Sequence, residues 1–130
     1  MRKLRFLLPL MLAVGVLALP VSGSATTPPG SIAIANQAQL LTDGSVVLTV
    51  SYTCAPGPAN DTTGVVVSSV QQGAIIGSAS ALATCDNRKH TAHLDNVVGP
   101  FSQGTANAVA AVENTSATSF AFTSRGVMVN

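Results

Sequence analysis

Residues 45–54, SVVLTVSYTC, decide the fold of this chain. The large apolar side chains Val46, Leu48, Val50 and Tyr52 recur at every second position, whereas serine and threonine fill most of the positions between them. Successive side chains of a β-strand point to opposite faces, so this period of two predicts a strand with one face in a core and the other toward solvent.

Six further runs flank this strand and share its β-branched or alternating character: residues 31–40, 64–72, 74–85, 88–97, 105–113 and 119–129. Turn signals such as Asp43-Gly44 separate them. The alanine-rich run 105–113 is compatible with a helix on propensity alone, but it has no capping box and lies between β-runs. About seven strands at regular spacing predict an all-β fold, an immunoglobulin-like antiparallel β-sandwich, with a small β-barrel as the alternative.

The first 25 residues have the pattern of a secretory signal peptide. Arg2, Lys3 and Arg5 precede an apolar stretch, residues 6–19, and small residues follow up to Ala25, where we expect cleavage. The apolar stretch is shorter than the roughly 20 residues of a membrane-spanning helix. We therefore expect a secreted, extracellular protein with no membrane span after processing.

Cleavage there leaves a flexible N-terminus, residues 26–30, and one sandwich domain, residues 31–130. The mature chain would hold three basic and five acidic residues, a net charge of −2. Only 8% of the full chain is charged, against roughly 25% in ordinary domains. Without a basic patch to neutralise phosphates, nucleic-acid binding is not expected.

Cys54 and Cys85 are the only two cysteines of the chain, and a disulfide, a metal site and a redox centre are the candidates. If consecutive strands run antiparallel, both cysteines end strands at the same end of the sandwich, and export permits the bond. A zinc site needs four ligands, and His90 and His93 would face opposite ways on a strand. Redox pairs normally have a CxxC spacing. We therefore predict a structural disulfide and no metal.

The polar loops at that end are the candidate contact residues. The cluster DNRKH, residues 86–90, is the densest polar stretch of the mature chain, and the topology places it beside the loops around residues 60 and 114. The candidates are Asn60, Asp61, Asp86, Asn87, Arg88, Lys89, His90 and Asn114. Charged turns exposed to solvent are the simpler interpretation of these residues. With no nucleophile-elbow motif, we predict no catalytic residue, no enzyme activity and no cofactor.

The order of a signal peptide, DGSVVLTVSYTC, SSVQQG and a Cys85-Asp86 turn resembles a family of small secreted actinobacterial domains of unknown function. The resemblance covers most of residues 33–129 and implies a bacterial source, export, one disulfide and an immunoglobulin-like sandwich, with no catalytic residues. A looser likeness is to the apoproteins of antibiotic chromoproteins. Those have two disulfides and an aromatic-lined cleft, whereas this chain has two cysteines and few aromatic residues.

Two functions follow as hypotheses. The first is a secreted non-catalytic binding or interaction module whose partner is an unknown extracellular molecule or cell-surface component. The second is a small-ligand carrier or inhibitor-like protein, which would need a cleft lined by Tyr52 and the phenylalanines. A deep apolar pocket would favour the carrier, and a filled core with polar end loops would favour the module.

Overall fold

Strands account for most of residues 30–130, the part of the chain that this computed structural model describes. The predicted signal peptide and residues 26–29 lie outside that part. One turn of 3-10 helix, η3 (Pro58–Asn60), is its single helical segment. The strands are β1 (Ser31–Ile34), β2 (Gln37–Leu40), β3 (Val46–Thr53), β4 (Thr63–Gln72), β5 (Ile75–Thr84), β6 (His90–Val97), β7 (Gly104–Asn114) and β8 (Phe120–Val129).

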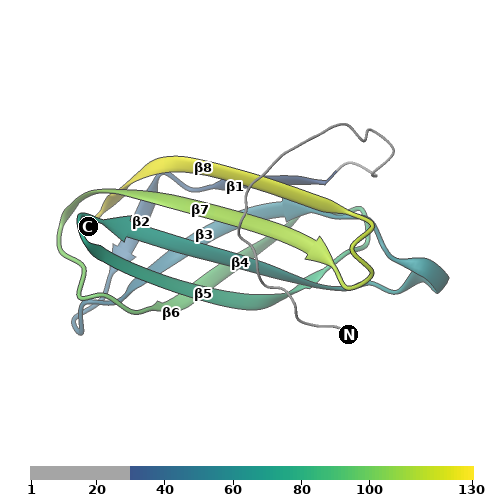
Figure 1. The fold of residues 1–130 in the computed structure, drawn as a ribbon, viewed down its shortest axis with the longest axis horizontal. Coiled ribbons are helices and arrows are strands. Elements are labelled where there is room, and N and C mark those ends of the chain that lie inside the picture. Colours follow the sequence, from purple (N-terminus) through teal and green to yellow (C-terminus); the bar gives the residue numbers. More distant parts are fainter. Residues whose placement is uncertain (1–29) are drawn as a thin grey trace.

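The strands form two packed layers. One layer has the order β1-β3-β6, and the other has the order β5-β4-β7-β8; in Figure 1 the second layer lies in front of the first. Strand β2 connects the layers along one side, because it pairs antiparallel with β3 and parallel with β8. On the other side no ladder joins β5 to β6 among the described strands. The fold is therefore an immunoglobulin-like β-sandwich and not a closed barrel.

The run 31–40 forms two strands instead of the single strand expected, which makes eight strands within residues 30–130. The break falls at Ala35 and Asn36. Within the break, the Ala35 amide still donates to the Thr49 carbonyl on β3, whereas the Asn36 carbonyl already accepts from the Met128 amide on β8. The chain thus changes layers within ten residues, which also makes one pairing of this largely antiparallel sandwich parallel.

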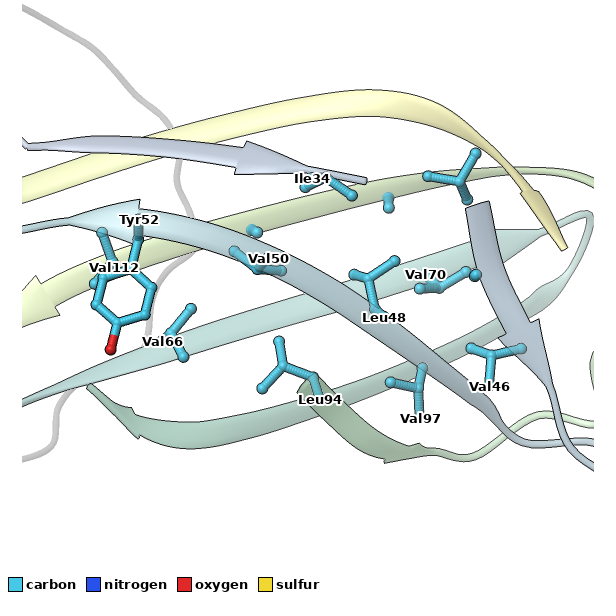
Figure 2. Packing of buried hydrophobic residues seen from close by; sticks show 14 of the residues in the cluster. Ile34, Val46, Leu48, Val50, Tyr52, Val66, Val70, Leu94, Val97 and Val112 are labelled. Carbon is cyan, nitrogen blue, oxygen red and sulfur yellow. The ribbon is translucent and has the colours of Figure 1, made fainter. Parts of the chain in front are cut away.

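The alternation seen in the sequence sets the core. Along β3 every second residue from Val46 to Tyr52 is buried, and these side chains pack against Val66, Val70 and Val112 of the other layer (Figure 2). Burying one such aliphatic side chain is worth about 1.5–3 kcal/mol. Alanines fill much of the remaining space, so these large side chains supply most of the hydrophobic stabilisation.

The alanine-rich run 105–113 is a strand, β7, as predicted. It pairs along almost its whole length with β4 on one side and β8 on the other. Its even-numbered residues, including Ala106, Ala108 and Val112, are buried, whereas Asn107 and Val109 point outward. Two neighbouring strands thus satisfy its backbone groups and override the helical propensity of alanine.

Candidate functional site

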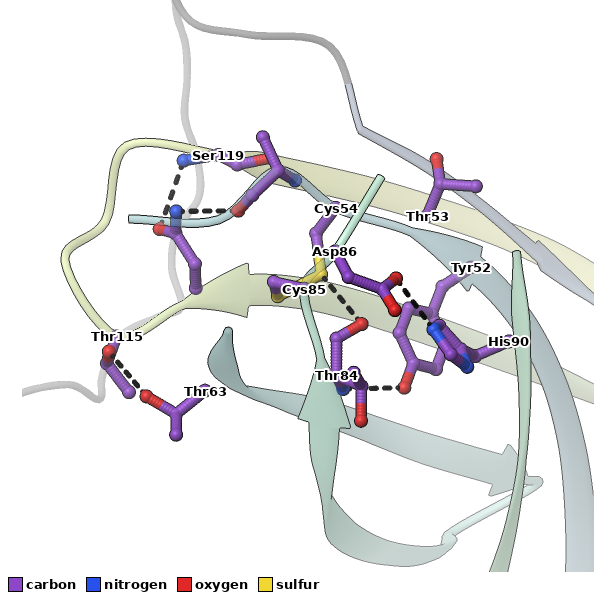
Figure 3. Close-up of a disulfide and its surroundings, with 12 residues drawn as sticks. Tyr52, Thr53, Cys54, Thr63, Thr84, Cys85, Asp86, His90, Thr115 and Ser119 are labelled. Atoms are coloured by element: carbon purple, nitrogen blue, oxygen red, sulfur yellow. Dashed lines mark hydrogen bonds and ion pairs between the residues drawn. A yellow bond between two sulfur atoms is a disulfide. The ribbon is translucent and has the colours of Figure 1, made fainter. Parts of the chain in front are cut away.

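A disulfide between Cys54 and Cys85 closes one end of the sandwich, as predicted (Figure 3). It joins the end of β3 to the end of β5, so it connects the two layers, and the Cα atoms are 4.6 Å apart. Both cysteines are buried in the core. The Tyr52 hydroxyl accepts a hydrogen bond from the Thr84 amide beside it, at 3.0 Å. A buried disulfide is compatible with an oxidising compartment outside the cytosol.

The loops that follow these cysteines lie together at this end, as the topological argument required. The Asn87 amide donates to the Cys54 carbonyl at 2.9 Å, and the Cys85 amide donates to the Thr62 carbonyl at 2.7 Å. The turn after β7 joins them, because the Thr115 amide donates to the Thr63 carbonyl. The structure therefore brings the candidate contact loops into one region, which we call the disulfide end (residues 54–63, 85–90 and 114–119).

Asn114 differs from the other candidates at the disulfide end because its side chain is only 2% exposed. Its amide donates to the Ala55 carbonyl and the Thr118 hydroxyl, and its side-chain oxygen accepts from the Thr118 and Ser119 amides. Three of these bonds lie within the β7–β8 turn, and the bond to the Ala55 carbonyl holds that turn against the chain that follows Cys54. Asn114 is therefore a structural residue of the loop and not part of its accessible surface.

Asn60 and Asp61 lie in an exposed loop that η3 bends sharply. Asn60 has a φ of 58°, in the left-handed region that asparagine tolerates better than most residues. The Asp61 carboxylate accepts from the Thr63 hydroxyl and amide and from the Thr115 hydroxyl. These bonds, the Thr63 hydroxyl first, lower the pKa of Asp61. Asp61 thus fastens two loops to each other, and its anionic form is the one that the fold favours.

The 86–90 loop is organised around the Asp86 carboxylate. His90 Nε2 donates to it at 2.8 Å, the Arg88 amide donates at 3.0 Å, and the bond from His90 is the main reason why the pKa of Asp86 is lowered. The His90 ring also lies 5.8 Å from the Tyr52 ring. Arg88 and Lys89 are exposed. His93 faces away from His90, as expected, and contacts the Thr49 hydroxyl.

Two open hollows occur elsewhere on the described surface. The larger, about 500 Å³, is bordered by polar side chains such as Asn36, Gln71 and Asn107 and also by glycines, Val127 and Met128, so polar and apolar groups share its lining. The smaller, about 370 Å³, lies by Gln37, Gln39 and His93. Neither is lined by an aromatic side chain apart from the His93 imidazole. The aromatic residues are divided instead: Tyr52 and Phe101 are in the core, and Phe120 and Phe122 are exposed.

The outer face of the β5-β4-β7-β8 layer holds a cluster of exposed apolar side chains that the sequence patterns did not single out. Leu82 is 89% exposed, Phe122 60% and Phe120 50%. The strand registers place these residues beside one another: Leu82 pairs with Val65, and Phe122 pairs with Ala111, which pairs with Val67. We call this cluster the apolar outer patch and define it as Val65, Val67, Leu82, Val109, Phe120 and Phe122.

The outer face of the other layer is polar by comparison. Ser31 pairs with Thr53, Ser51 pairs with Thr91, and Thr49 pairs with His93. The Ser31 and Thr53 hydroxyls also bond each other, at 2.8 Å. The two exposed faces of the sandwich thus differ in chemistry. Only the face with the apolar outer patch presents a cluster of apolar side chains whose burial against a partner would be favourable in free energy.

Sequence periodicity missed the patch because β4 is apolar on both parities: Val66 and Val70 point inward, whereas Val65 and Val67 point outward. The same ambiguity affects β8, where the exposed phenylalanines look like core residues in the sequence. The continuous apolar run from Val65 to Val67 was the available signal, because such runs are typical of strands covered on both faces. Here the outer face has no cover within the described chain.

Residues 30–130 contain no grouping of three or more histidine, cysteine or acidic side chains able to hold a metal ion. Nor does that part of the chain include a helix with the length and apolar character needed to cross a membrane.

Comparison with known proteins gives no match to a family model, to a curated protein or to a solved structure. The resemblance to small secreted actinobacterial domains therefore stays a prediction.

Proposed function

We propose that this protein is a secreted, non-catalytic interaction module that binds its partner through the outer face of the β5-β4-β7-β8 layer. One observation carries the proposal: apart from Val98, which follows β6, the exposed large apolar residues of the described chain gather on this face, and the opposite face is rich in serine and threonine. Interface cores are enriched in aromatic residues and depleted of charge. The apolar outer patch contains two phenylalanines, and Glu113 is the one ionisable side chain that the four strands place beside it.

The rigid surroundings of the patch support a recognition role. β4 and β7 lie at the centre of the layer, and each pairs with strands on both sides. A partner that docks on paired strands meets side chains already held in place, so little conformational entropy is lost on binding. The disulfide end borders the same face, and its exposed polar groups, including Asp61, Arg88 and Lys89, provide a polar rim beside the apolar centre.

The small-ligand carrier receives less support from this geometry. Such a carrier would enclose its ligand in a largely apolar pocket, whereas the larger hollow is open and bordered by amide side chains. The disulfide, which is compatible with export, agrees with the predicted signal peptide and supports an extracellular site of action.

Photo-crosslinking from a single position tests the proposal. A benzophenone amino acid replaces Phe122 on the patch, and in a matched control it replaces Thr91 on the polar face. Both proteins are exposed to the culture medium and cell surfaces of the source organism. We expect a discrete crosslinked product from position 122 and none from position 91. Products of equal yield from both positions, or none from position 122, would overturn the proposed surface.

A further inference from the structure

The strand registers arrange the apolar outer patch in rows across the layer. One row runs Leu82, Val65, Glu113, Phe120 from β5 to β8, and the next runs Ser80, Val67, Ala111, Phe122. Each row therefore has a phenylalanine at its β8 end. Toward its β5 end it has aliphatic or small side chains. At its β5 end the first row has the strongly exposed Leu82, and the second row has the smaller Ser80.

Glu113 is the single ionisable side chain that the four strands place on this face. Their only other ionisable residue, Arg125, opposes the inward-facing Ala108, and its guanidinium donates to the Ile34 carbonyl on β1. Val65 of β4 and Phe120 of β8 flank Glu113 in its row. Among the described residues its carboxylate has no ion-pair partner, and burial among these neighbours raises its pKa.

We propose that a second copy of this chain occupies the face, packed face to face about a two-fold axis parallel to the strands, and that the Glu113 carboxylate weakens this pairing until it is protonated. The inference rests on the proposed function, because it takes the same surface as the binding site. If this axis runs between β4 and β7, β5 of one copy faces β8 of the other. Each row of one copy then faces the same row of the other copy in reverse order. Each Phe120 then lies over Leu82 of the other copy.

This symmetry matches the shape and the charge of the face. Phe120 and Phe122 of one copy lie over Leu82 and Ser80 of the other, so the phenylalanines of the two copies do not oppose each other. Glu113 of one copy lies over Val65 of the other and not over the second carboxylate. The pairing thus avoids direct opposition of like charges, but it buries each carboxylate against an aliphatic side chain, which costs free energy while the group is ionised.

The available area predicts a weak dimer. Four strands spaced about 4.8 Å apart and about ten residues long, at about 3.3 Å each, give a face of roughly 600 Å². Stable specific interfaces bury about 800 Å² on each partner. Full overlap of the two faces therefore falls somewhat short of a standard interface, and the apolar outer patch covers only part of it. We expect dissociation constants in the micromolar range or weaker at neutral pH.

Protonation of Glu113 removes the cost of burying its charge, so association is coupled to proton uptake. Asp61, in the loop next to this end of β7, is the other acidic group nearby in the fold; its bonds from Thr63 and Thr115 lower its pKa, so it stays ionised where Glu113 titrates. β5 contributes no ionisable residue. The dimer should therefore tighten as pH falls, by up to about tenfold per pH unit for each proton taken up.

Sedimentation velocity at pH 4.5, 6.0 and 7.5, over protein concentrations from 1 µM to 1 mM, tests the inference. We expect the parent to dimerise at least tenfold more tightly at pH 4.5 than at pH 7.5. Glu113→Gln should remove most of this pH dependence and dimerise at pH 7.5 as the parent does in acid. Asp95→Asn, which neutralises an exposed carboxylate on β6 of the other layer, is the matched control and should behave like the parent.

Phe122→Ser should keep the protein monomeric at every pH, and the conservative Val67→Thr provides a second patch variant if the first does not fold. A monomer at all pH values and concentrations, or a dimer unaffected by both patch variants, would overturn the inference. If the parent stays monomeric but position 122 still crosslinks to another protein, the second copy is wrong and the proposed function stands. If both experiments fail, the face is not a binding surface.

Discussion

Removing the Cys54–Cys85 disulfide should cost this domain a large part of its stability. The two cysteines are 31 positions apart, and closing a loop of that length reduces the entropy of the unfolded chain by an amount worth about 3–4 kcal/mol. Net stabilities of domains are about 5–15 kcal/mol. For a domain of about 100 residues, a loss of this size corresponds to a decrease in melting temperature of roughly 12–30 °C.

Two perturbations separate the loop constraint from the packing of the sulfur atoms. Reduction of the parent keeps both side chains, so its lower melting temperature measures the constraint. The double variant Cys54→Ala, Cys85→Ala also empties buried volume, because both cysteines are at most 1% exposed, and it should melt at or below the reduced parent. Circular dichroism or differential scanning calorimetry with and without reductant provides the comparison.

A thiol assay checks the starting state. The parent, unfolded in denaturant without reductant, should present no thiol to an Ellman-type reagent. If the reduced parent melts within about 3 °C of the oxidised one, the argument from loop entropy is wrong for this fold, and the disulfide has some other role.

Three further outcomes follow from the described contacts. Asn114→Ala removes the four hydrogen bonds of a buried side chain and should lower the free energy of unfolding by about 2–4 kcal/mol in urea titrations, whereas the exposed neighbour Thr115→Ala should stay within about 1 kcal/mol of the parent. Gly64→Ala places a Cβ 2.6 Å from Cys85 Sγ and 2.7 Å from the Glu113 carbonyl oxygen, so it should destabilise by about 1–3 kcal/mol; an unchanged midpoint would contradict that packing. Burial raises the pKa of Glu113 above its ordinary value of 4.5. The ionised carboxylate therefore destabilises the folded state when the pH is above the pKa of the folded protein, and this cost disappears when the pH is below the pKa of the unfolded chain. Glu113→Gln should therefore stabilise the monomer at pH 7.5 but not at pH 3.5, and equal effects at both pH values would refute the sign.

Much of the fold could be predicted because its determinants are local. The alternation from Val46 to Tyr52 fixes which side of β3 enters the core, and the turn signals fix where the strands end. The two cysteines follow from the same logic, because strands that reverse at each turn carry both of them to one end. Even the alanine-rich β7 was predictable from its β-rich neighbours, although its own propensity favours a helix.

Other features depend on partners that are distant in the sequence. The division of residues 31–40 into β1 and β2 depends on whether the chain finds β3 or β8, which lie on different layers. Asn114 looked like an exposed turn residue, but its amide reaches Ala55, 59 positions away, and is buried by that contact. Nothing in the local pattern distinguishes an asparagine that meets solvent from one that ties two loops together.

The sequence by itself thus determined the strands other than the division of residues 31–40, the parity of β3 and the disulfide. Only the tertiary structure decided which apolar residues of β4 and β8 are covered. Each layer of a two-layer sandwich has one face against the other layer, and a strand that is apolar on both parities must expose one set. Val65, Val67, Phe120 and Phe122 are exposed because the described chain has no third layer to cover them. The sequence pattern shows which residues are apolar and how they are spaced, whereas the presence of a layer that covers them is a property of the whole fold.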